Sequence, residues 1–167
     1  LTKNKPKPLV NVNQKPFFDY ILYELKKSKI SNIVFLTGYK GSVLEEYYKN
    51  HKQFNIKFSY LSPKAETGTR LLNSLQLLDK NFLLLYSDNY WKIQINKMIN
   101  NLKYKKIKNS MTVFNNFDGS GEYGIQNNIY YDNNKFIIDY DKTRKNKFLN
   151  GVDIGYFILA KKDIINL

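Results

Sequence analysis

Hydrophobic and polar positions follow two alternating patterns along the first part of the chain. Apolar residues three or four positions apart predict amphipathic helices at residues 16–30, 42–50, 67–78 and 93–106, with Ser42 as the N-cap of the second. Short apolar runs between them predict buried strands at residues 32–39, 56–61 and 82–87. A regular alternation of helix and strand implies right-handed crossovers, and hence a parallel sheet covered by helices on both faces.

The run from Phe82 to Tyr86 is apolar at every position and ends at Ser87 and Asp88. A central parallel strand has no need to alternate, because both of its faces are buried. In open α/β sheets, ligands bind beyond the carboxyl ends of the strands. The pattern therefore predicts a buried strand that holds the Asp88 carboxylate over a ligand crevice.

Beyond residue 108 the pattern changes to short strand-like segments separated by Gly, Asn and Asp turns. These segments lie at residues 110–117, 123–126, 128–132, 135–141 and 152–160, with a hairpin turn at residues 132–134. We therefore predict an α/β fold with a mostly parallel central sheet and an antiparallel C-terminal extension. No repeat or linker divides the chain, so residues 1–167 are predicted to form a single domain.

Charge and composition narrow the candidate partners. The net charge is +13, but lysine supplies 25 of the 27 basic residues and asparagine is also abundant, at 22. Such a composition is typical of an AT-biased genome, and the lysines are scattered, so we predict no nucleic-acid partner. A phosphorylated small substrate remains compatible with the charge.

No apolar stretch approaches the roughly 20 residues of a membrane-spanning helix, and the polar N-terminal residues do not resemble a signal peptide. We predict no membrane partner, and the absence of cysteine fits a cytoplasmic protein. The sequence begins without methionine and stops where residues 161–167 begin a helix. We therefore expect a domain that is truncated at both ends.

Three stretches carry candidate chemistry, and each has an ordinary structural alternative. Asp88 suits Mg²⁺, which binds a few carboxylates together with waters and phosphates, but it could equally cap a turn. The segment 63–70 places Gly68 at a helix start, where free N–H groups could meet an anion or a base edge; the alternative is a Thr-capped loop. Lys7 lies between two prolines, which makes it either a rigid charge for phosphate or part of an extended basic strand.

Several motifs occur together in an order that resembles the sugar-phosphate nucleotidylyltransferases. The segment "KPKPLVNVNQKP", then a helix, a strand and "GY", resembles the N-terminal part of that family. "AETGTRLLNSLQLL" is similar to its "E-x-x-x-GTAGAL" segment, and "FLLLYSDNYW" to its "FLVLNGDNYF" segment. "EYGI", "IDYDK" and "LNGVDIGYFIL" are similar to its "YGVV", "EKP" and "NAGIYLF" segments. The match covers nearly the whole chain, and its pattern is nearest to the short bacterial enzymes acting on hexose or heptose 1-phosphates.

The resemblance implies a Rossmann-like nucleotide-diphospho-sugar transferase fold. It also implies an Mg²⁺-dependent reaction in which an NTP and a sugar 1-phosphate give an NDP-sugar and pyrophosphate, for surface polysaccharide or glycan precursors. By motif, Lys7 and Asp88 would be catalytic, with Asp88 also the metal ligand. The remaining implied contacts are nucleotide-binding Glu66, Thr67, Gly68 and Thr69, and sugar-phosphate-binding Gly124, Lys142, Asn150 and Asp153. Homo-oligomerisation is left open.

The sequence also departs from the family pattern. The Gly-x-Gly-Thr-Arg loop of the first strand would precede Leu1, and the second metal carboxylate would follow Leu167. Arg70 replaces a small residue, Ser87 replaces glycine, and "YDK" replaces "EKP". Two interpretations follow: a clipped piece of an active enzyme, which we favour because the pattern runs unbroken from the first residues, or a non-catalytic nucleotide- or sugar-phosphate-binding module of the same fold.

Overall fold

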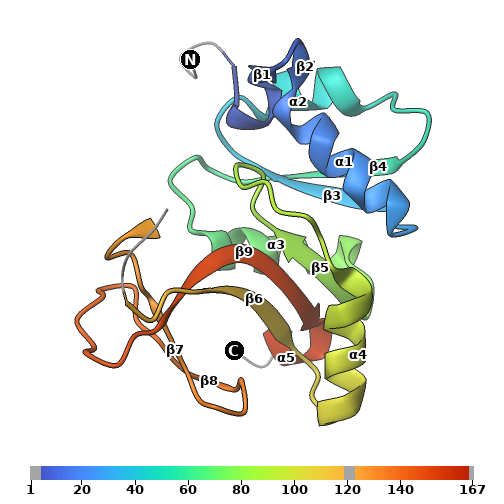
Figure 1. Ribbon diagram of the computed structural model, residues 1–167. Helices are drawn as coiled ribbons and strands as arrows, with labels where there is room; N and C mark the ends of the chain where they lie inside the picture. Colours follow the sequence, from blue (N-terminus) through green and yellow to red (C-terminus); the bar gives the residue numbers. More distant parts are fainter. Residues whose placement is uncertain (1–4, 119–122, 166–167) are drawn as a thin grey trace.

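Helices and strands are arranged around three sheets, one of them a very short hairpin (Figure 1). The computed structural model describes residues 5–118 and 123–165. The chain begins with a 3-10 turn η1 (Lys7–Leu9) and the two-residue strands β1 (Asn11–Val12) and β2 (Lys15–Pro16). The second sheet pairs β3 (Asn32–Thr37) with β4 (Asn55–Tyr60) in parallel. Helices α1 (Phe17–Lys27) and α2 (Gly41–Tyr48) accompany it.

Helix α1 forms because its apolar residues recur at helical spacing and its cations lie in the last turn, where they complement the helix dipole. Its buried face packs against β3 and α2: the Phe18 ring lies 4.8 Å from that of Phe35, which stacks on Tyr48 at 5.5 Å. The core around these rings contains Leu9, Phe18, Ile21, Leu22, Leu25, Phe35, Leu44, Tyr48 and Phe54.

The third and largest sheet is antiparallel and is built around the ten-residue strand β9 (Gly151–Ala160). On β9 pair β5 (Asn81–Leu85), β6 (Ser110–Asn115) and β7 (Ile129–Tyr131), and β7 pairs in turn with β8 (Ile137–Tyr140). The remaining helices are α3 (Thr67–Asn73), η2 (Leu75–Leu77), α4 (Ile95–Lys105) and α5 (Lys161–Ile165). Within the described ranges, no helix is both long enough and apolar enough to cross a membrane.

The predicted α/β class and the antiparallel extension are confirmed, including the hairpin turn, where Lys135 N donates to the Asp132 carbonyl at 3.0 Å. The parallel part is smaller than expected, since β3–β4 is the one parallel pair among the described strands. The predicted burial of residues 82–86 on both faces is wrong, because these residues are only half-buried, and β5 pairs with β9 alone among the described strands. Its second edge faces a groove.

Other boundaries differ for local reasons. Ser42 is not an N-cap, because α2 already begins at Gly41 and its N-cap is Lys40, in the left-handed region at φ 52°. The predicted helix 67–78 breaks at Ser74, whose hydroxyl donates to the Leu71 carbonyl at 2.8 Å and so competes with the helix pattern. Residues 123–126 form a turn and not a strand, with Gly124 at φ 47°. The last two residues of the predicted C-terminal helix lie outside the described part of the chain.

Tyr48 gives this core a pH dependence. Its side chain is only 1% exposed, and its hydroxyl donates a 2.7 Å hydrogen bond to Oδ1 of Asp19. Burial, and then the bond to the carboxylate, raise the pKa of Tyr48 well above its usual value of 10.0. The folded state therefore holds this proton more tightly than the unfolded state, so the stabilisation is complete below pH 10.0 and declines as pH rises above it.

We expect Tyr48→Phe to lower the free energy of unfolding by about 1 kcal/mol at neutral pH, because one buried hydrogen bond is lost. The variant should also lose stability less steeply than the wild type above pH 10.0. Urea unfolding across a pH series measures both effects. Tyr104→Phe is the matched control, since Tyr104 is 87% exposed. An unchanged alkaline slope in Tyr48→Phe would contradict this account.

Candidate active site

Asp88 and Lys7 meet at the carboxyl end of β5, although 81 positions separate them in sequence. The strand direction continues past Leu85, because Tyr86 N still donates to the Gly155 carbonyl at 2.9 Å. Asp88 follows two residues later, and its Oδ2 lies 2.8 Å from Nζ of Lys7. Both side chains are open to solvent, at 43% for Asp88 and 65% for Lys7, so a ligand can reach the pair.

Lys7 is held by a rigid backbone. Leu9 N donates to the Pro6 carbonyl at 2.9 Å, which closes the turn η1, and Pro8 and Leu9 are buried beneath it. The extended-strand alternative is therefore wrong for residues 7–9. The hydrogen bond to Asp88, and then the charge of Asp88, raise the pKa of Lys7, so this side chain is a cation at neutral pH.

The loop that carries Asp88 is tied to strand β9. Asn89 Nδ2 donates to the Ile154 carbonyl at 3.1 Å, and the Tyr156 hydroxyl donates to the Asn89 carbonyl at 3.0 Å. The same hydroxyl accepts a 2.9 Å bond from Trp91 N. Asp88 therefore sits on a fixed support, which is what a preorganised charge requires.

A second carboxylate, Asp153 on β9, lies in the same neighbourhood. Its Oδ2 accepts a 2.8 Å bond from the Tyr140 hydroxyl, and its Oδ1 accepts a 2.7 Å bond from Gly155 N. Burial raises the pKa of Tyr86, and the charges of Asp153 and Asp88 raise it further. A hydrogen bond with Tyr140 lowers the pKa of Tyr86, but the net shift is upward, so its hydroxyl is protonated at neutral pH.

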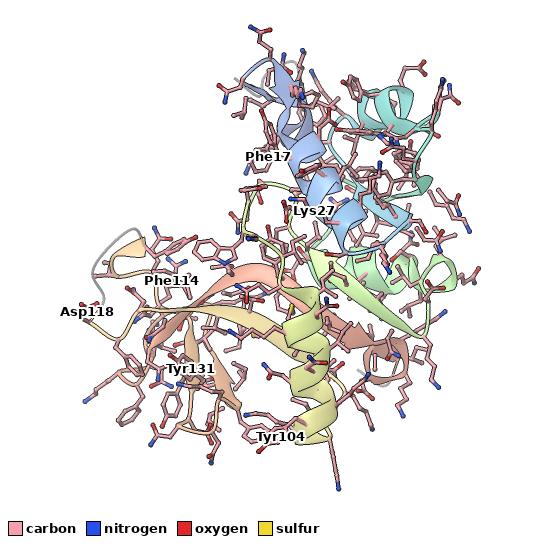
Figure 2. All side chains as sticks on the ribbon, turned by 45° about the vertical axis from the view of Figure 1, so that its right-hand side comes forward. Phe17, Lys27, Tyr104, Phe114, Asp118 and Tyr131 are labelled. Carbon is pink, nitrogen blue, oxygen red and sulfur yellow. The ribbon has the colours of Figure 1, made fainter. Side chains whose placement is uncertain are left out.

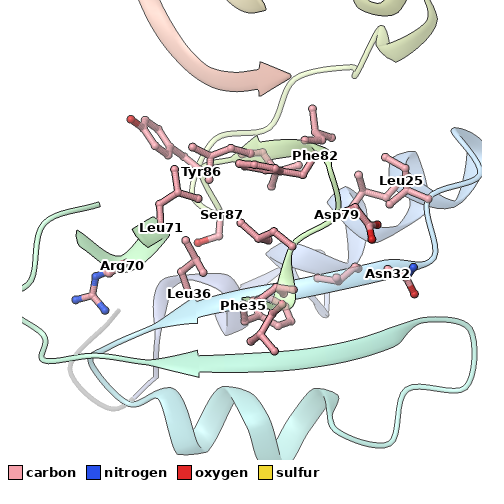
Figure 3. A pocket seen from close by; sticks show the side chains of 18 of the residues that line it. Leu25, Asn32, Phe35, Leu36, Arg70, Leu71, Asp79, Phe82, Tyr86 and Ser87 are labelled. Carbon is pink, nitrogen blue, oxygen red and sulfur yellow. The ribbon is translucent and has the colours of Figure 1, made fainter. Parts of the chain in front are cut away.

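The residues predicted to bind the nucleotide surround the start of α3. All four, Glu66 to Thr69, are exposed, and Thr67 lines the same groove as Ser87 and Asp88. Figure 3 shows the neighbouring Arg70 at the same end of this groove as Tyr86 and Ser87. The structure therefore brings the start of α3 and the end of β5 to one rim.

Arg70 has a structural role that was not predicted from the sequence. There it was noted only as a replacement for the small residue of the family pattern. Its guanidinium donates to three backbone carbonyls, those of Thr37 at 2.6 Å, Ser62 at 2.7 Å and Ala65 at 3.1 Å. It also lies over Gly38, where a Cβ would come within 2.5 Å of Nη2. The side chain thus fastens the loop before α3 to the end of β3, and Gly38 makes room for it.

Arg70→Lys is expected to loosen this loop. A lysine cannot reproduce the planar fork of donors, so most of the three bonds are lost, and we expect a cost of about 1–3 kcal/mol in unfolding free energy. Urea unfolding measures the cost, and limited proteolysis reports cleavage within residues 61–66. Arg144→Lys, at an exposed turn, is the matched control. Equal stability and equal protection of the loop in the two variants would contradict the assignment.

The predicted sugar-phosphate residues other than Asp153 lie around strands β7 to β9. Gly124 O accepts a 2.7 Å bond from Asn116 Nδ2, and Lys142 is exposed in the turn after β8. The Asn150 side chain bonds both backbone groups of Tyr131, at 3.1 Å through Oδ1 and 2.9 Å through Nδ2. Direct contact between predicted site residues is therefore seen for Lys7 and Asp88. The ligand roles of the others stay predictions.

A metal ion would have to be held mainly by Asp88. No group of three or more His, Cys, Asp or Glu side chains that could form a metal cage occurs among the described residues. Asp88 Oδ1 has no recorded partner in the same part of the chain, while Oδ2 faces Lys7. This donor set fits Mg²⁺, which commonly uses one or two carboxylates and completes its shell with waters and substrate phosphates.

Comparison with known proteins decides the family. The sequence model of the nucleotidyl transferase family matches residues 1–139. The chain belongs to this family. The predicted membership among sugar-phosphate nucleotidylyltransferases, and with it the predicted class of enzyme, is confirmed.

Individual relatives agree with this assignment. The chain is 29% identical over 169 residues to the D-glycero-alpha-D-manno-heptose 1-phosphate guanylyltransferase of Campylobacter jejuni, covering 99% of this chain and 71% of that protein. It is 28% identical to a putative mannose-1-phosphate guanyltransferase of Sulfolobus acidocaldarius, covering 99% of this chain and 45% of the relative. The structure of HddC from Yersinia pseudotuberculosis complexed with GMP-PN superposes with a TM-score of 0.77 at 18% identity, covering 100% of this chain and 74% of that one. This likeness confirms the predicted nucleotide-sugar transferase fold.

Proposed function

We propose that the full-length protein transfers a guanylyl group from GTP to a heptose or mannose 1-phosphate, with Mg²⁺, and releases pyrophosphate. The observation that carries the proposal is the Lys7–Asp88 pair, in which an ammonium suited to phosphate and a carboxylate suited to a metal ion meet 2.8 Å apart at an open strand end. Family membership supplies the two substrate classes, a nucleoside triphosphate and a sugar 1-phosphate.

In this reaction, a phosphate oxygen of the sugar 1-phosphate forms a bond to the α-phosphorus of the nucleotide. The bond between the α-phosphorus and the bridging oxygen breaks, and pyrophosphate leaves with that oxygen. The chain's part is to position the reactants and to meet the negative charge. When bound, Mg²⁺ would supply a Lewis acid at Asp88, the residue that would hold it.

Lys7 is suited to contact phosphate because its ammonium is exposed and stays charged. Its only recorded partner within the described ranges is Asp88, so a phosphate that approaches the same edge competes with a single surface ion pair. Such exposed pairs contribute at most about 1 kcal/mol, which a charge-assisted bond to phosphate can replace. Lys7 would then turn from the carboxylate to the substrate.

The choice of guanine and of the sugar rests on relatives. The Campylobacter and Sulfolobus proteins are named for guanylyl transfer to a heptose and a mannose 1-phosphate, respectively. We place base and ribose recognition at residues 66–69 and the sugar phosphate near Asp153, as the motifs imply. A cytoplasmic location and a role in surface polysaccharide or glycan precursor synthesis belong to the same proposal, and homo-oligomerisation stays a prediction.

A second candidate is a binding module of the same fold without catalysis. It is favoured by Ser87, which stands where the family has glycine, and by Arg70, whose guanidinium is committed to backbone carbonyls. A module of this kind would bind nucleotide and release no pyrophosphate.

The test is pyrophosphate release by the full-length protein with Mg²⁺, using the four common NTPs against a panel of sugar 1-phosphates. We expect release with GTP and a heptose or mannose 1-phosphate, and none when the metal is chelated. Nucleotide binding by calorimetry, without release for any pair, would replace the proposal with the binding module. Release with another base would keep the reaction and overturn the assignment of guanine.

A further inference from the structure

One buried hydroxyl, that of Tyr156 on β9, bonds the backbone just beyond Asp88. Tyr156 is only 2% exposed, and its hydroxyl donates to the Asn89 carbonyl at 3.0 Å. The same oxygen accepts a 2.9 Å hydrogen bond from Trp91 N. A neutral hydroxyl has one proton to donate and lone pairs to accept, so both bonds can form at once. The segment 89–91, which follows Asp88 directly, is therefore held at both ends by a single atom.

The protonation state of Tyr156 keeps both bonds intact. Burial raises the pKa of Tyr156, and although the bond from Trp91 N lowers it, the net shift is upward. The hydroxyl therefore keeps its proton at neutral pH and donates to Asn89. Phenylalanine has the same ring without the hydroxyl, so it would remove the two bonds and preserve the packing of the ring.

Strand β9 is bulged at the residues that hold this segment. The register between β6 and β9 shifts between Met111 and Val113, so residues 154–156 lie opposite Thr112 alone. All three residues of the bulge bond the chain as it leaves β5. Bulges are common beside active sites, where they redirect a side chain. The bulge therefore explains why residues of β9 bond the loop after β5 at this point and do not pair with β6.

Asp88 itself has no comparable anchor. The ring of Trp91 lies 6.3 Å from the ring of Phe114 on β6, which Figure 2 labels, so the far end of the segment 89–91 is also fixed by packing. Within the described ranges, the one hydrogen bond or ion pair recorded for the Asp88 side chain is with Lys7, whose own side chain is 65% exposed. An exposed partner fixes a carboxylate poorly, so the position of Asp88 depends on the segment that follows it.

We propose that Tyr156 is a positioning residue for the Asp88 carboxylate, and that its hydroxyl determines how tightly the site holds a divalent cation. The inference rests on the proposed function, because it takes Asp88 as the metal ligand. Removing a group that orients a metal ligand typically costs about 10–100-fold in metal affinity or activity. In the family segment "NAGIYLF", isoleucine follows the glycine that corresponds to Gly155, so the hydroxyl at position 156 is a feature of this chain.

Paramagnetic broadening by Mn²⁺ tests the metal affinity without requiring activity. Mn²⁺ accepts the same oxygen ligands as Mg²⁺, and Trp91 lies close to Asp88 in sequence. The full-length protein is labelled with 5-fluorotryptophan, the fluorine signal of Trp91 is assigned from a Trp91→Phe variant, and manganese chloride is titrated. We expect the midpoint of the broadening to lie about tenfold higher in Tyr156→Phe than in the wild type.

Two further variants serve as controls for this titration. Tyr48→Phe also loses a buried hydroxyl that makes a hydrogen bond, but in the core beside α1, so it should keep the wild-type midpoint. Asp88→Asn should remain unbroadened at Mn²⁺ concentrations that saturate the wild type. A wild-type midpoint in Tyr156→Phe, or broadening in the wild type that is absent or does not depend on Asp88, would overturn the inference.

The Mg²⁺ dependence of pyrophosphate release separates positioning from a general loss of structure. In Tyr156→Phe, the Mg²⁺ concentration for half-maximal rate should rise about tenfold, while kcat at saturating Mg²⁺ and KM for the sugar 1-phosphate stay near their wild-type values. A lower kcat with an unchanged Mg²⁺ requirement would assign Tyr156 a structural role and overturn the inference. If the wild type releases no pyrophosphate with any pair of substrates, the proposed function fails, and the Mn²⁺ titration still decides the role of Tyr156.

Discussion

Replacing Asp88 with asparagine in the full-length protein is expected to lower the rate of nucleotidyl transfer by about 100-fold or more. The substitution keeps the shape of the side chain and removes its charge, so both the metal ligand and the partner of Lys7 are lost. Deleting one preorganised electrostatic contact typically costs a factor of about 10²–10³ in rate. The measurement is the initial rate of pyrophosphate release at saturating substrates, over a range of Mg²⁺ concentrations.

The control for this variant is Asp79→Asn. Asp79 is also exposed and lines the same groove, at the end away from Ser87 (Figure 3). We expect it to keep the wild-type rate. The unfolding free energy of Asp88→Asn should change by no more than about 1 kcal/mol, because the ion pair is exposed. Equal activity of the two variants would refute the role of Asp88.

Gly155→Ala is expected to give the largest loss of stability among the substitutions considered. Gly155 has φ 79°, and a Cβ there would lie 2.3 Å from Cδ2 and 2.7 Å from Cγ of Tyr86. The left-handed backbone adds roughly 1–2 kcal/mol and the clash with the ring roughly 1–3 kcal/mol, so we expect a loss of about 2–5 kcal/mol in unfolding free energy. Urea denaturation measures it.

Gly68→Ala is the matched substitution with the opposite expectation. No atom lies within 4 Å of the Cβ position, and the residue is in helix α3. Alanine should therefore leave stability unchanged or raise it by up to about 1 kcal/mol. If both substitutions cost the same, the close packing of Tyr86 on Gly155 cannot be the cause.

Most elements of the fold could be predicted because their patterns are local. Helix α1 follows from the spacing of its apolar residues, and the β7–β8 hairpin follows from an Asp-Asn-Asn turn between two apolar runs. The element boundaries were predicted wrongly where the surrounding structure overrides a local sequence preference. Ser42 has the chemistry of an N-cap, yet the turn before α2 begins the helix one residue earlier.

Individual residues of the candidate site could be predicted where they stand next to a recognisable sequence pattern. Asp88 stands out because an apolar strand stops beside it, and Lys7 because prolines flank it. Their 2.8 Å contact depends on the tertiary fold. Because the two residues are 81 positions apart, no local sequence pattern indicates this contact. The same holds for Arg70: three hydrogen bonds to carbonyls from two separate segments cannot be inferred from a single arginine in a helix.

The half-burial of β5 could not be predicted from the sequence. The pattern of apolar residues indicates which surroundings a strand would tolerate, but it does not show which other strands lie beside it. The run from Phe82 to Tyr86 suits a strand with a partner on each side. The described chain supplies β9 on one side and an apolar groove on the other.

The central claim is attack on the α-phosphorus at the Asp88 edge, and label transfer tests it most directly. The full-length protein is incubated with Mg²⁺, a heptose 1-phosphate, and GTP labelled at either the α- or the γ-phosphorus. The account predicts that the α label enters the nucleotide sugar and that the γ label is released in pyrophosphate. Transfer of the γ label to the sugar phosphate, or no Mg²⁺-dependent transfer of either label, would contradict it.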